Sequence, residues 1–135
     1  MLERLVAAAA IFLAANFVMS YIIPAPAPSP WWLVFPFGRE GAQATWTFGR
    51  IDGFPLVLML AVAGLTVLAF IGAFLATFGI WVAADLWRAL VIVGASGSLA
   101  LFLLHLGPWA VAPLALDLLL LWVALSAVWT PSSAT

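Results

Sequence analysis

The sequence predicts an all-α protein, an integral membrane four-helix bundle with a long Pro/Trp-rich loop between helices 1 and 2. Hydrophobic residues make up 67% of the 135 residues and charged residues only 7%, against roughly 45–50% and about 25% in soluble domains. Four apolar stretches are each long enough to cross a bilayer core of ~30 Å. The only long polar stretch separates the first from the second, so we expect one transmembrane domain over residues 1–135.

The composition also excludes several classes of function. Four scattered arginines and no lysine leave no basic patch for nucleic acid. The absence of cysteine excludes disulfides, thiolate metal sites, iron–sulfur clusters and thiol catalysis. Arginine without lysine, together with abundant alanine, leucine and valine, indicates a GC-rich bacterial genome and therefore the bacterial inner (cytoplasmic) membrane.

The first helix is predicted at about residues 4–23, where the apolar run is nearly unbroken. Asn16 and Ser20 lie four residues apart on one face, which suits packing against other helices, and a ligand contact is the alternative for Asn16. Small residues at i, i+3 and i+7 form a second packing seam, made of Ala7, Ala10 and Ala14. A cleaved signal peptide is the alternative, because Ala25-Pro26-Ala27 resembles a cleavage site, but Pro28 and the weakly basic start favour a helix.

The connection at residues 24–54 is an extramembrane loop. Its alternating prolines at 24–30 cannot continue a helix, and the aromatic run at 31–37 is too short to span and favours the headgroup region. Loops this long are uncommon unless they are functional or disordered. One expectation is a small hairpin or cap around 44–48. The functional alternative is a lid or docking surface that uses Arg39, Trp46 and Arg50.

The second helix is predicted at about residues 55–80, because Pro55 suits the first position of a helix. A tight turn follows it. Trp81 and Trp87 bracket this turn, and tryptophan is enriched where a membrane meets water. Both are therefore expected at the interface.

The third helix is predicted at about residues 86–106, with Asp85 capping its free amides. Asp85 and Arg88 are three residues apart, so Arg88 is expected to form a salt bridge with Asp85 or to contact lipid phosphate. The Gly94-x-x-x-Ser98 spacing lets a neighbouring helix approach closely. The tightest helix crossing is therefore expected there.

The fourth helix is predicted at about residues 109–129, after a Gly107-Pro108 turn, with Pro113 as the alternative first residue. Asp117 interrupts its apolar run, so it must face the bundle, be protonated or pair across helices. It lies ~14 Å deep if counted from the turn, but only ~6 Å from Pro113. In the second case the helix dipole favours a carboxylate there, which is the structural alternative.

His105 precedes the same turn on the neighbouring antiparallel helix. If the fourth helix starts at Pro113, His105 and Asp117 lie at similar depths and form a candidate proton-binding site. The alternative is a capping or interfacial histidine. One histidine cannot supply both axial ligands of a bis-His haem, and no acid or histidine pair has the i,i+4 spacing of a metal site. We therefore expect no cofactor.

The arginines barely decide the orientation. With the amino terminus inside, Arg4 and Arg88 face the cytoplasm and Arg39 and Arg50 face out, a tie in the count that normally sets topology. The free amino terminus tips the balance toward cytoplasmic N- and C-termini.

The C-terminal third resembles small uncharacterised four-helix bacterial integral membrane proteins. The resemblance rests on the order of four short motifs, namely Trp87-Arg88, Leu104-His105, Pro108-Trp109 and Leu116-Asp117. Ala89 and the inserted Leu106-Gly107 depart from that pattern. The resemblance implies the membrane fold and no activity.

The expected function is that of a non-enzymatic multi-pass membrane protein, either an accessory subunit or a small ligand- or lipid-binding bundle. Its partners would be membrane lipid, other membrane protein subunits or further copies of itself. One alternative is an oligomeric proton-coupled transporter or channel that uses Asp117 and His105. A second is a membrane enzyme acting on lipid or quinone, which would need a polar pocket joining Arg39 or Arg50 to the bundle.

Overall fold

The computed structural model describes residues 1–22, 56–104 and 111–134, and every regular element among them is helical. Four α-helices are present in these residues, and two short 3-10 helices accompany them. They are α1 (Leu2–Ile22), α3 (Leu56–Phe78), η1 (Ala84–Leu86), α4 (Trp87–Leu104), α5 (Val111–Ser126) and η3 (Pro131–Ala134). The prediction of an all-α fold with four helices is confirmed. The predicted loop at 24–54, with its possible hairpin, lies outside the described residues.

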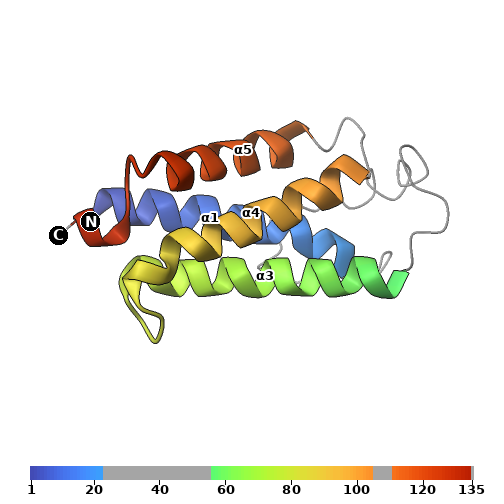
Figure 1. Ribbon diagram of the computed structural model, residues 1–135, viewed down its shortest axis with the longest axis horizontal. Helices are drawn as coiled ribbons and strands as arrows, with labels where there is room; N and C mark the ends of the chain where they lie inside the picture. Colours follow the sequence, from blue (N-terminus) through green and yellow to red (C-terminus); the bar gives the residue numbers. More distant parts are fainter. Residues whose placement is uncertain (23–55, 105–110, 135) are drawn as a thin grey trace.

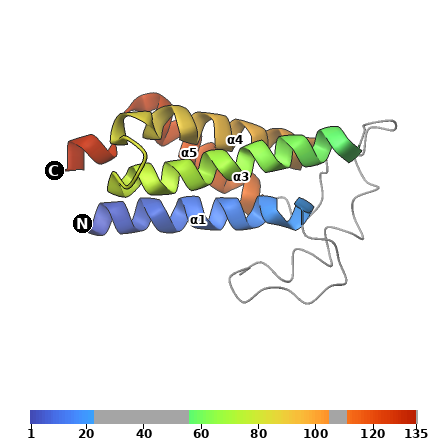
Figure 2. The same ribbon diagram turned by 90° about the horizontal axis from the view of Figure 1, so that it is seen from below.

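The four α-helices lie side by side along the long axis of the molecule and alternate in direction (Figures 1 and 2). Consecutive helices pack against each other most extensively, whereas α1 and α5 touch at far fewer positions. The two termini lie at the same end of the bundle (Figure 1). The first and last helices are therefore neighbours joined by a less complete interface.

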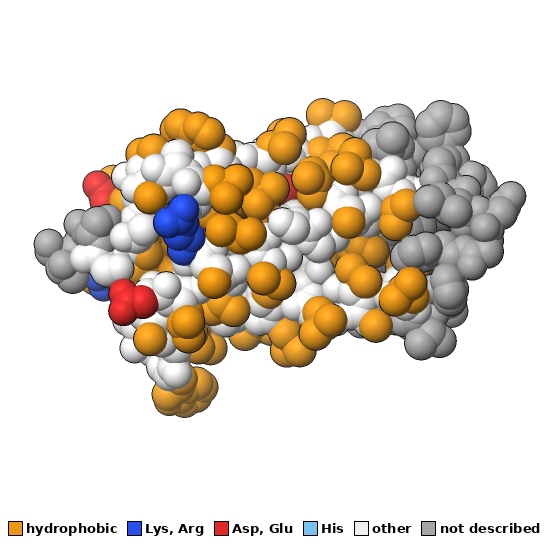
Figure 3. All heavy atoms as spheres, in the orientation of Figure 1, with side chains coloured by type: hydrophobic (Ala, Val, Ile, Leu, Met, Phe, Trp, Pro, Cys, Tyr) orange, Lys and Arg blue, Asp and Glu red, His pale blue; other side chains and the backbone are white. Residues whose placement is uncertain are grey.

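Three of the helices are long and apolar enough to cross a membrane, over Leu2–Met19, Leu58–Phe78 and Ala84–Leu104. α5 is apolar but has 16 residues, or about 24 Å at the usual helical rise, against ~30 Å of hydrocarbon. Large apolar side chains are exposed along the helices, and Figure 3 shows hydrophobic side chains across one face. They include Leu65, Leu68, Ile71, Val93, Leu118, Trp122 and Leu125. Such a surface suits lipid rather than water.

Side chains of α3 pack tightly against two glycines of α4. A Cβ atom on Gly94 would lie 2.8 Å from Cδ1 of Phe70, and one on Gly97 would overlap Oγ1 of Thr66. Phe70 and Thr66 are both buried on α3. The close crossing predicted at Gly94 and Ser98 is present at Gly94. Its second residue is Gly97 rather than Ser98, because the Ser98 side chain faces α5.

The α3–α4 turn differs from the sequence expectations. Asp85 lies inside η1, whose N-cap is Ala83 and has no side-chain cap hydrogen bond, so Asp85 does not occupy the cap position predicted for it. Trp81 is 95% exposed, whereas Trp87 is 1% exposed. The prediction of an interfacial Trp87 is wrong. Its Nε1 donates to Oγ1 of Thr77 over 3.1 Å, and this partner allows the whole indole to be buried.

Candidate functional site

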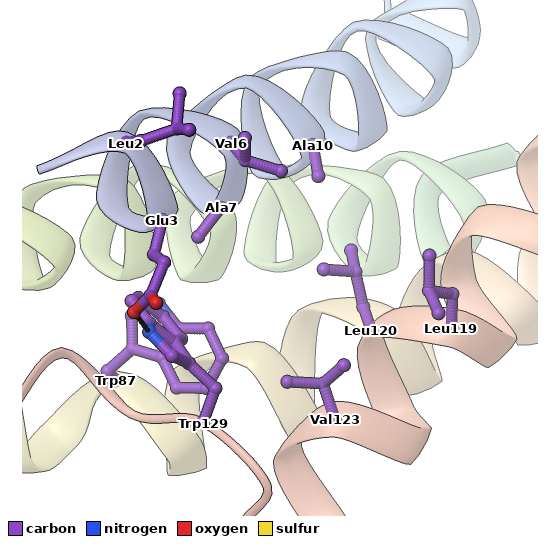
Figure 4. A pocket seen from close by; sticks show the side chains of 10 residues that line it. All are labelled: Leu2, Glu3, Val6, Ala7, Ala10, Trp87, Leu119, Leu120, Val123 and Trp129. Carbon is purple, nitrogen blue, oxygen red and sulfur yellow. Dashed lines mark hydrogen bonds between the residues drawn. The ribbon is translucent and has the colours of Figure 1, made fainter. Parts of the chain in front are cut away.

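The incomplete contact between α1 and α5 leaves a groove of about 370 Å³, shown in Figure 4. Its walls are apolar or aromatic except for one carboxylate. The lining residues are Leu2, Glu3, Val6, Ala7, Ala10, Trp87, Leu119, Leu120, Val123 and Trp129. Leu2, Val6 and Leu119 are each more than half exposed, at 75%, 61% and 53%. The groove is therefore open along the outer face of the bundle.

Small residues on α1 create this space. Ala7 and Ala10 face α5 across the groove, where a larger side chain would fill it (Figure 4). Ala14, one turn further, is 1% exposed and belongs to the core. The predicted small-residue seam thus divides into two parts: Ala14 packs as expected, and the other two line an opening.

One end of the groove is polar. Nε1 of Trp129 donates to Oε2 of Glu3 over 2.9 Å, and the Trp87 and Trp129 rings meet edge to face with centroids 5.2 Å apart. Because Trp87 donates to Thr77, both indole N–H groups at this end already have partners. The polar group that remains toward the groove is the Glu3 carboxylate, which is exposed and still has acceptor capacity.

The C-terminal segment is held across the same end. Nη2 of Arg4 donates to the Pro131 carbonyl over 3.0 Å, linking α1 to η3. Nε of Arg4 is buried and has no hydrogen-bond partner among the described residues. Arg88 makes a comparable bond between α4 and α5: its Nη2 donates to the Leu125 carbonyl, near the end of α5, over 3.2 Å. These two arginines fasten the last helix and the tail to the bundle.

Asp117 faces the interior between α4 and α5. It is 1% exposed and accepts a hydrogen bond from Oγ of Ser98 over 2.6 Å. α5 begins at Val111, two residues before Pro113, so Asp117 lies in the second turn, beyond the reach of the first free amides. Pro113 lies in the first turn, where its missing N–H removes no intrahelical bond. Asp117 therefore fits the interpretation of a residue that pairs across helices better than that of a carboxylate stabilised in the first turn of its own helix.

Of the remaining predicted site residues, Asn16, Asp85 and Arg88 lie within the described part of the chain. Nδ2 of buried Asn16 donates to the Phe12 carbonyl of its own helix over 3.0 Å. Asp85 and Arg88 are exposed at the end of the bundle that holds the termini. His105, Arg39, Arg50 and Trp46 lie outside the described residues. Within the described residues, no group of three or more histidine, cysteine or acidic side chains is placed to hold a metal ion.

Comparison with protein-family models, with curated proteins and with solved structures gave no match. The resemblance of the C-terminal third to small bacterial membrane proteins therefore has no support from these comparisons. The groove and the buried Ser98–Asp117 pair are the two structural features that point to a function.

Sequence reasoning did not single out Glu3 or Trp129 as site residues, and it placed Trp87 at the membrane interface rather than in a groove. Glu3 and Trp129 are 126 positions apart, and they meet because the termini lie at one end. The sequence did carry one signal for this contact: Trp129 ends the fourth apolar run, and Glu3 comes just before the first. In an antiparallel bundle with an even number of helices, these positions come to the same side.

Proposed function

We propose that this protein is a multi-pass membrane protein that holds a hydrocarbon chain of a membrane lipid in the α1–α5 groove, without catalysing a reaction. The observation that carries the proposal is the apolar wall of the groove, open along the outer face of the bundle. Its volume falls in the range of about 300–1,000 Å³ usual for small-molecule sites. Apolar walls without free donors bind alkyl chains and reject polar solutes.

The length of the groove favours a lipid chain over a partner helix. On α1 the lining residues run from Leu2 to Ala10, which is about 12 Å of helix. A transmembrane helix of another subunit, or of a second copy, would pack along most of the bilayer thickness. A flexible chain entering from the bilayer needs only this short slot.

The placement in the membrane belongs to the same proposal. Arg4 and Arg88 lie at the end that holds both termini, and the free amino terminus at that end tips the tied arginine count toward the cytoplasmic side. We place both termini in the cytoplasm and the protein in a bacterial inner membrane. α5 is then the fourth crossing, and its 16 residues require local thinning of the bilayer or short flanking segments at membrane depth.

The test fills the groove and measures retained lipid. In Ala10→Phe the new ring occupies the space between α1 and α5. The matched control is Ala9→Phe, because Ala9 is exposed and does not line the groove. After purification in mild detergent, native mass spectrometry should find lipid on the parent and on the control but much less on Ala10→Phe. Equal lipid on the two variants, with helix content unchanged, would overturn the proposal.

A second candidate, proton-coupled transport by an oligomer, is favoured by the burial of Asp117 between two helices. A titratable side chain at membrane depth marks proton pathways in many transporters. His105 is the other residue predicted for this role. In proteoliposomes, Asp117→Asn should abolish pH-driven flux if the candidate is right. Unchanged flux, or no flux in the parent, removes it.

A further inference from the structure

We infer that the α1–α5 groove selects a membrane phospholipid whose headgroup carries an ammonium, of the ethanolamine type. This inference rests on the proposed function and adds the chemistry of the headgroup. It follows from the polar end of the groove, where Glu3, Trp87 and Trp129 meet (Figure 4).

Among the side chains that line this end, the Glu3 carboxylate is the free acceptor, while both indole donors are occupied. Nε1 of Trp129 is bound to Glu3 and Nε1 of Trp87 to Thr77. An ionised carboxylate accepts up to about four hydrogen bonds, and the Trp129 indole uses one of them. A headgroup that donates hydrogen bonds can use the remaining acceptor positions of Glu3, as a primary ammonium does with three N–H groups.

The charge of the Glu3 carboxylate favours a cationic headgroup. The partner of Glu3 is a neutral indole, so this contact leaves the negative charge of the carboxylate uncompensated. The two arginines at the same end keep their charge but point to backbone carbonyls, Arg4 to that of Pro131 and Arg88 to that of Leu125. Neither of them lines the groove. An ammonium next to Glu3 is attracted, whereas an anionic headgroup without one is repelled.

The indole ring of Trp129 adds to this preference for a cation. Trp129 is partly exposed beside the carboxylate, and the buried Trp87 holds it edge to face at 5.2 Å between centroids. A cation near an indole face is attracted by the ring quadrupole, and tryptophan is the best residue for this interaction. The carboxylate and the ring therefore favour the same kind of headgroup, while the apolar slot takes the chain.

The test is a competition between two phospholipids with identical acyl chains, one with an ethanolamine and one with a glycerol headgroup. The full-length protein is equilibrated with an equimolar mixture in mixed micelles, and bound lipid is counted by native mass spectrometry. The parent should prefer the ethanolamine lipid by about two- to fivefold, as a partly exposed ion pair provides. A preference for the glycerol lipid, or none, would overturn the inference.

Two variants assign the preference to the groove. Glu3→Gln keeps an acceptor for Trp129 but removes the charge, so the ratio should fall to about one. The control Asp85→Asn removes an exposed acid at the same end that does not line the groove, and its ratio should stay that of the parent. If Glu3→Gln keeps the parental ratio while Ala10→Phe loses lipid, only the headgroup inference fails. If Ala10→Phe retains lipid, the proposed function fails.

Discussion

Oγ of Ser98 on α4 donates to Oδ2 of Asp117 on α5 over 2.6 Å, and each residue is 1% exposed. The pair matters because α5 buries only four residues, Pro113, Asp117, Leu120 and Ala124. These lie on one stripe at helical spacing, so a single face holds α5 to the bundle. The polar pair sits in the middle of that face and fixes the rotation of α5 against α4.

Ser98→Ala should destabilise the protein by about 1–3 kcal/mol, because it leaves the buried Asp117 without its hydroxyl donor. The matched control is Ser96→Ala on the same helix, where the side chain is exposed and the expected change is within about 0.5 kcal/mol. Equilibrium unfolding in mixed micelles measures both free energies. Equal effects of the two substitutions would contradict a structural role for the pair.

Asp117→Asn should leave the free energy of unfolding within about 0.5 kcal/mol of the parent. The asparagine has nearly the same shape, and its amide oxygen can accept from Ser98. Asp117→Ala should cost about 1–3 kcal/mol, because it leaves the Ser98 hydroxyl unpaired and opens a small cavity. The same unfolding titration compares them. An asparagine variant as unstable as the alanine variant would mean that the carboxylate itself is required.

Gly94→Ala should destabilise the bundle by about 1–3 kcal/mol through overpacking. Its methyl group would lie 2.8 and 2.9 Å from two ring carbons of Phe70, and Phe70 is fully buried. Gly64→Ala is the matched control, since a Cβ there meets nothing within 4 Å. It should be neutral or stabilising, because alanine forms helix better than glycine. Thermal unfolding in detergent should separate the two variants, and a stable Gly94→Ala would mean that α3 and α4 are further apart.

The apolar runs of the sequence were sufficient to predict the helices, and the glycine spacing was sufficient to predict the crossing at Gly94. Long apolar runs have few structures open to them in lipid, so the four helices follow almost from composition. The burial of Asp117 could also be predicted, because a lone acid in an apolar helix has to face other protein. Its partner could not, because Ser96 and Ser98 are equivalent in sequence and only the rotation of α4 distinguishes them.

The groove could not be predicted, because it depends on how completely α1 and α5 close the bundle. Ala7, Ala10 and Ala14 lie on one face of α1 and have the same size, yet only Ala14 is fully buried. Small residues permit close packing but do not enforce it. Whether they pack or leave a slot is decided by the side chains opposite, here Leu119, Leu120 and Val123.

Trp87→Phe tests the largest difference between sequence and structure. The substitution removes the Nε1 donor and part of the buried ring, so it should cost about 1–3 kcal/mol of unfolding free energy. The cost stays moderate because Oγ1 of Thr77 still donates to the Ala73 carbonyl over 2.8 Å. Trp81→Phe is the control, because Trp81 is 95% exposed, and it should change stability by less than about 0.5 kcal/mol.

If both tryptophans were interfacial, as their positions in the sequence indicate, the two substitutions would have similar small effects. The structure predicts a clear difference between them instead. Trp87 also forms one wall of the groove and supports Trp129. Trp87→Phe should therefore lower lipid retention as well, while Trp81→Phe keeps it. Loss of stability with full lipid retention would separate the core role of Trp87 from the groove and weaken the proposed lipid site.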